Sequence, residues 1–113
     1  MKYTEIIKEV KDLYPNEYSE SELKKWIYEL EQTAAVYSGE AVNAPENLNC
    51  ETLIKEPFDR MYLDYVMAQA SLHQHDDESY SRYISIFNSR YREWQKWYIQ
   101  AHEGKKIRFK NWI

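Results

Sequence analysis

The sequence predicts an all-α fold, a small helical bundle of about four helices. Apolar residues recur at steps of three and four over most of the chain, which is the spacing of one helix face. Only 2 Gly and 3 Pro are present, too few for the many turns of an all-β domain. Because 113 residues is the size of one domain, we expect a single helical domain over residues 1–113.

The first helix is expected at residues 4–14, where the apolar residues follow helical spacing. Thr4 is a suitable N-cap, because its hydroxyl can accept a backbone N–H of the first turn. Pro15 should end this helix, because the residue before a proline is pushed out of the α region.

The second helix is expected at residues 19–35. Ser19 and Glu22 have the S-x-x-E spacing of a capping box, in which each side chain satisfies a backbone N–H of the other residue. Gly39 follows shortly afterwards and is a natural terminator, since glycine accepts the left-handed conformation that ends many helices.

The longest periodicity predicts two further helices at 58–74 and 78–102, with Pro57 in the first turn of the earlier one. Each should bury one apolar stripe against a partner. The first stripe is Phe58, Met61, Tyr65, Ala68 and Leu72, and the second is Tyr80, Ile84, Phe87, Tyr91, Trp94, Tyr98 and Ala101.

The join between these helices is expected to be a tight turn at about 74–78, giving an antiparallel hairpin. The two stripes are out of phase across it, and the three acids Asp76, Asp77 and Glu78 suit a helix N-terminus. A single bent helix remains the alternative, because neither Gly nor Pro stands at the join.

Two segments lack a clear helical pattern. Residues 38–56 predict a long loop, in which residues 52–54 could lie extended against the body, and loops of this length are often functional or mobile. Residues 103–113 predict an extended tail that mixes apolar and basic side chains. Because such a tail is unfavourable in water, we expect it to lie on a neighbouring molecule or on its own body.

The net charge of −4 conceals a strong asymmetry along the chain. Residues 1–81 carry 7 Lys+Arg against 17 Asp+Glu, a net charge of −10. Residues 82–113 carry 8 against 2, a net charge of +6. This asymmetry can pair copies head to tail, present a basic face to a polyanion, or be neutralised within one fold where the last helix lies beside acidic helices.

No residue pattern predicts catalysis. His73, His75, Asp76 and Asp77 cluster at the predicted turn, but residues two apart do not share a helix face and the spacing fits no metal-ligand pattern. Cys50 has no nearby base and no partner for a disulfide, which favours a reducing compartment. No nucleotide-binding or hydrolase motif is present, so we expect no enzyme, no cofactor and no small-molecule substrate.

No apolar run approaches the 18 residues typical of a membrane span, and the N-terminus lacks a signal-peptide pattern. We therefore expect a soluble intracellular protein without a membrane partner. Basic and aromatic residues alternate in the last third, a mixture that suits protein interfaces and could also make weak contact with nucleic acid. The candidate interface residues are Arg90, Arg92, Lys96, Lys105, Lys106, Arg108, Phe109 and Trp112.

The stretch from P-F-D-R-M-Y to S-R-Y-I-S-I-F-N-S-R-Y-R-E-W-Q-K-W-Y resembles a family of small proteins encoded among the head genes of phages and prophages of Gram-positive bacteria. That family is similar to head–tail connector proteins, also called head-completion or adaptor proteins. The resemblance implies a virion protein that forms rings and contacts portal or tail proteins, first in the bacterial host cytoplasm. The matching residues are Pro57, Phe58, Asp59, Tyr62, Tyr65, Tyr83, Phe87, Asn88, Tyr91 and Tyr98.

Overall fold

A computed structural model describes residues 1–102 and confirms the all-α prediction, with four helices and no strand in that range. The predicted tail, 103–113, lies outside the described residues. The helices are α1 (Tyr3–Leu13), α2 (Glu20–Ser38), α3 (Met61–His73) and α4 (Asp77–Ala101).

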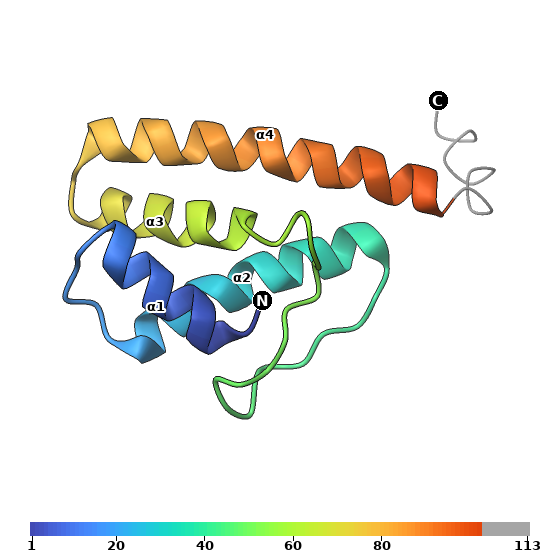
Figure 1. Cartoon of the computed structure of the whole chain (residues 1–113), viewed down its shortest axis with the longest axis horizontal. Coiled ribbons are helices and arrows are strands. Elements are labelled where there is room, and N and C mark those ends of the chain that lie inside the picture. The colour runs from blue at the N-terminus through green and yellow to red at the C-terminus, as the bar shows by residue number, and fades with distance from the viewer. Residues whose placement is uncertain (103–113) are drawn as a thin grey trace.

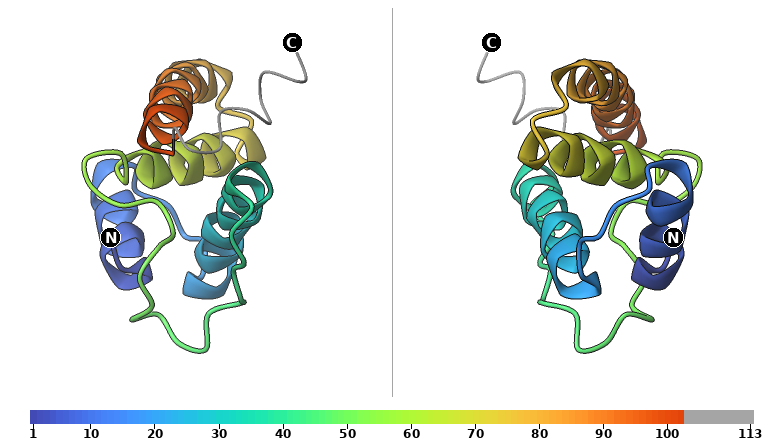
Figure 2. Two further views of the ribbon diagram at one scale, coloured as in Figure 1. Left: turned by 90° about the vertical axis from the view of Figure 1, so that its right-hand side faces the viewer. Right: turned by 90° about the vertical axis from the view of Figure 1, so that its left-hand side faces the viewer.

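The helices form three layers with α3 in the middle (Figures 1 and 2). The long helix α4 runs along one side of α3, and α1 and α2 lie together on the other side. Buried apolar side chains from all four helices and from Ile54 build one core around α3.

The central position of α3 makes the predicted single stripe of this helix wrong. Leu72 was expected in the core but is 43% exposed, whereas Leu63 and Met67, outside the predicted stripe, are buried. A helix with neighbours on both sides buries nearly all its faces, and its sequence is apolar all round. The buried residues of α3 are Met61, Tyr62, Leu63, Asp64, Val66, Met67, Ala68, Ala70 and Ser71.

The expected start of this helix is also wrong. Pro57 was expected in the first helical turn, but α3 begins only at Met61. The chain before it folds into successive turns, in which Phe58 N–H donates to the Lys55 carbonyl at 3.0 Å and Tyr62 N–H to the Asp59 carbonyl at 3.2 Å. These short-range bonds replace a first α-helical turn.

The hairpin between α3 and α4 is confirmed, so the single bent helix is excluded. His75 adopts a left-handed conformation with φ of 60° between the two helices. Asp76 caps α4, because its carboxylate accepts the Ser79 N–H at 3.3 Å. The Tyr14 hydroxyl donates to the same carboxylate at 2.9 Å and ties the turn to the end of α1.

The ends of α1 and α2 follow the sequence prediction in part. Ser19 caps α2 by accepting the Glu22 N–H at 3.1 Å. The helix ends at Ser38, three residues beyond the expected 35, and Gly39 follows it with φ of 76°. Thr4, however, is not the cap of α1 but its second residue. Its backbone N–H donates to the Leu48 carbonyl at 2.9 Å. A carbonyl of the long loop therefore accepts one of the N–H groups that have no partner within the first turn of this helix.

Candidate functional site

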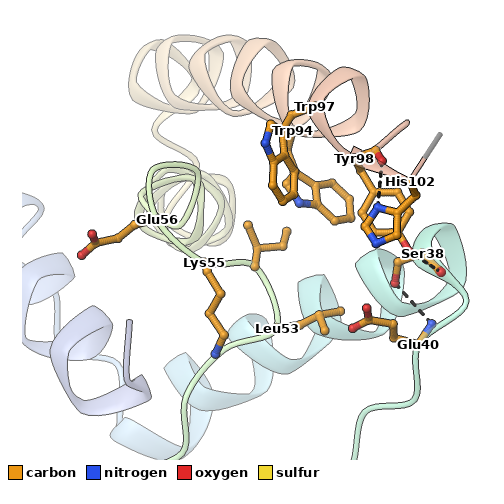
Figure 3. Close-up of a pocket in the computed structure, with 10 residues that line it drawn as sticks. Ser38, Glu40, Leu53, Lys55, Glu56, Trp94, Trp97, Tyr98 and His102 are labelled. Atoms are coloured by element: carbon orange, nitrogen blue, oxygen red, sulfur yellow. Dashed lines mark hydrogen bonds between the residues drawn. The ribbon is translucent and has the colours of Figure 1, made fainter. Parts of the chain in front are cut away.

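The candidate site is a small pocket at the C-terminal end of α4, which we call the end pocket (Figure 3). It has a volume of about 120 Å³. Three segments that are distant in the sequence form it: the end of α2, residues 53–56 of the loop, and the last turns of α4. The lining residues are Ser38, Glu40, Leu53, Ile54, Lys55, Glu56, Trp94, Trp97, Tyr98 and His102.

The α4 wall of the end pocket is held by aromatic contacts and hydrogen bonds. Trp94 and Tyr98 are one helical turn apart, with ring centroids separated by 5.5 Å. The His102 ring stacks on the Tyr98 ring, with centroids 3.9 Å apart. The Tyr98 hydroxyl donates to the Ser38 carbonyl at 2.8 Å, which fastens α4 to the end of α2. This wall is therefore rigidly placed.

Trp97 differs from these neighbours because it is 46% exposed. Its ring centroid lies 5.3 Å from that of Phe58, and Trp97 lines the end pocket (Figure 3). A half-exposed Trp beside buried aromatic residues offers a partner a large apolar area at little conformational cost.

The loop wall is held in place by a buried carboxylate on α2. Glu31 is 4% exposed, accepts the Leu53 N–H at 2.8 Å and accepts the hydroxyl of Tyr62 on α3. The same hydroxyl accepts the Ile54 N–H at 3.0 Å. Burial raises the pKa of Glu31, although both hydrogen bonds and Lys55 oppose the shift. Residues 52–54 are thus docked on the body, as the sequence predicted, with Thr52 buried.

A second, open concavity of about 490 Å³ adjoins the end pocket and shares Glu40, Leu53 and Lys55 with it. We call it the acidic groove. The loop residues 40–46 and 50–53 form most of it. Its described lining holds one basic residue, Lys55, against four acids. Those acids are Glu31, Glu40, Glu46 and Glu51.

The two concavities together suit a basic peptide segment with an apolar side chain. Pockets for small molecules usually measure about 300–1,000 Å³, so the end pocket is of a size for one side chain. The acidic groove beside it would attract positive charge. Neither property requires a catalytic group.

Three of the candidate interface residues, Arg90, Arg92 and Lys96, lie on α4, but only Arg90 forms an ion pair in the described part of the chain. Arg90 forms an ion pair with Asp64 of α3 at 2.6 Å, and the Asp64 side chain is only 7% exposed. Burial raises the pKa of Asp64, while the Arg90 charge lowers it. Arg92 and Lys96 are exposed. The other candidate interface residues, Lys105, Lys106, Arg108, Phe109 and Trp112, lie outside the described residues.

The residues of the histidine cluster at the hairpin turn make separate structural contacts. The His73 ring packs against Trp26 with centroids 5.1 Å apart, and Asp76 caps α4. Within residues 1–102 no group of three or more His, Cys, Asp and Glu side chains could hold a metal ion. Cys50 is half-buried and lines the acidic groove. None of the helices described is both long and apolar enough to cross a membrane.

The end pocket is not predicted by any pattern in the sequence. Trp94 and Tyr98 were placed in the stripe of the last helix, but neither Trp97 nor His102 was assigned to a site. The pocket depends on residues 53–56 meeting α4, and no local pattern predicts that contact. An indication was the position of Trp97 outside the apolar stripe. No protein-family model, curated protein or solved structure matches the chain.

Proposed function

We propose that the protein is a phage or prophage structural protein, a head–tail connector or head-completion adaptor that acts by self-association and by contacts with portal or tail proteins. It would work in the bacterial host cytoplasm during assembly and then in the virion. The observation that carries the proposal is the end pocket, with the half-exposed Trp97 beside an acidic groove. The resemblance of Pro57–His102 to small head-gene proteins supports the same function.

The rest of the surface is consistent with an assembling protein. Val36 is 86% exposed on α2, and Leu13 is 55% exposed on α1. Large apolar side chains in water favour association when they gather with polar residues around them. The three-layer body positions these surfaces on helices, which hold an interface geometry more firmly than loops do.

Light scattering over a concentration series, with and without portal protein, tests the proposal. We expect mass to rise with concentration or a stable complex to form with the portal. Trp97→Ala should weaken this association, because a Trp at a pocket edge is a typical interface hot spot. Ile86→Ala is the matched control, an exposed apolar residue on the same helix and away from the pocket. A strict monomer without portal affinity would contradict the proposal.

A second candidate function is a small helical module that contacts nucleic acid or a protein through the basic last third. Arg92 and Lys96 favour it, since they are four residues apart, lie on one face of α4 and are exposed. A DNA mobility shift that weakens with salt would support this candidate. Replacing Arg92 and Lys96 with Gln should abolish the shift, whereas Arg90 is unsuitable for this test because it pairs with Asp64.

A further inference from the structure

We propose that the end pocket and the acidic groove of one molecule receive residues 105–112 of a second copy of this chain. The inference rests on the proposed function, since it names the surface through which copies associate.

The charges of tail and groove are complementary. Residues 103–113 carry 4 Lys+Arg against 1 Glu. The groove lining carries the exposed Glu40, Glu46 and Glu51, with Lys55 as the basic residue of its described part. Such complementary charges steer two proteins together and fix their register. The association should therefore weaken as salt screens these charges.

The apolar residues of the tail match the end pocket. Ile107 and Phe109 alternate with Arg108 and Lys110, and Trp112 follows after Asn111. An apolar side chain of the tail could therefore enter the pocket while neighbouring cations face the acids. The pocket volume of about 120 Å³ accommodates one such side chain. Trp97 would cover it, because half of its surface is free to pack on a ligand.

The chain that follows the described residues is long enough to reach a second copy. The tail starts directly after His102, which itself lines the end pocket. Phe109 and Trp112 follow His102 by seven and ten residues, and eleven extended residues reach roughly 36–40 Å. A tail that continued away from the body would carry these side chains past its own pocket and within reach of a neighbour's. Repeating this head-to-tail contact closes a ring or continues as a filament.

Cross-linking between two labelled copies tests the contact. In a Cys50→Ser background, one copy carries Asn43→Cys in the acidic groove and the other carries Asn111→Cys in the tail, and a short bismaleimide joins them. We expect a covalent heterodimer. The control replaces the groove cysteine with Ser21→Cys, which is exposed at the start of α2 and should link poorly.

Charge exchange tests the same contact independently. Lys105→Glu with Lys106→Glu should weaken self-association about tenfold or more. Adding Glu40→Lys and Glu46→Lys should restore it, because the opposite charges face each other again. Lys24→Glu with Lys25→Glu makes the same change in net charge on α2 and should have little effect.

The outcomes separate this inference from the proposed function. Self-association that is unaffected by the tail charges and gives no groove–tail heterodimer would overturn the inference but leave the proposed function standing. A chain with both cysteines that forms only an internal link within a monomer would overturn the assignment to a second copy. A protein that never associates, even with portal protein, would overturn both.

Discussion

Helices α3 and α4 pack against each other along the upper part of the molecule, yet they are buried to very different degrees (Figure 1). Nine of the 13 residues of α3 are buried, so almost every face of it meets protein. In α4 only Phe87, Trp94 and Tyr98 of 25 residues are buried. The difference arises because α3 has neighbours on both sides, while α4 lies on the outside. It follows that α3 contributes more buried side chains to the stability of the fold, whereas most residues of α4 face solvent.

The largest expected effect comes from truncating a side chain of α3. Leu63 is 2% exposed, so Leu63→Ala should lower the free energy of unfolding by about 2–5 kcal/mol through lost burial and a cavity. Ile86→Ala on α4 removes a comparable side chain that is already 38% exposed and should cost about 1 kcal/mol or less. Urea denaturation measures both values, and equal losses would contradict the contrast between the helices.

A smaller effect is expected from the ion pair that joins the two helices. Arg90→Ala should destabilise the protein by about 1–2 kcal/mol, because it leaves the buried carboxylate of Asp64 without its partner. Arg92→Ala, two residues away and exposed, should change stability by less than about 0.5 kcal/mol. The cost of Arg90→Ala should shrink as the pH falls and Asp64 takes up a proton. A cost that is independent of pH would show that packing, not charge, is lost.

The smallest expected effect concerns Glu31, which accepts the Tyr62 hydroxyl on the far side of α3. Burial raises the pKa of Glu31 in the folded protein. Its contribution to stability is therefore fully present below the ordinary carboxyl pKa and is lost as the pH rises through the raised value. Glu31→Gln should remove this pH dependence, so that the variant gains stability relative to the wild type as the pH rises.

The difference for Glu31→Gln should be on the order of 1 kcal/mol. Thermal unfolding between pH 4 and pH 8 measures it, with the exposed loop variant Glu46→Gln as the control. A Glu31→Gln protein that is less stable than the wild type at pH 7 but not at pH 4 would contradict the prediction. That result would mean that the ionised carboxylate supports the loop.

Local signals in the sequence predicted the structure correctly where the conformation of a segment depends on its own residues. Ser19 and Gly39 mark the ends of α2 because capping depends on a few adjacent backbone groups. The acids of the α3–α4 turn likewise act on the helix that they begin. The stripe of the last helix was predictable because α4 lies on the outside of the body, which leaves a single buried face.

Local signals failed where a distant segment takes part. Thr4 is a good capping residue, but the Leu48 carbonyl already accepts its N–H. The stripe of α3 could not be identified, because burial on two sides removes the contrast between faces. The end pocket was missed because Trp97 and Leu53 meet only when the loop docks through Glu31 and Tyr62.

Spacing and composition were enough to predict the fold class, the charge asymmetry and the aromatic stripe of α4, and they favoured the hairpin, since these features depend on neighbouring residues. Packing between distant segments places α3 at the centre and pairs Arg90 with Asp64, while Arg92 and Lys96 face solvent. The same packing brings loop and helix together around a pocket. The physical reason is that burial depends on how many elements surround a residue, and that number is set by packing between distant parts of the chain.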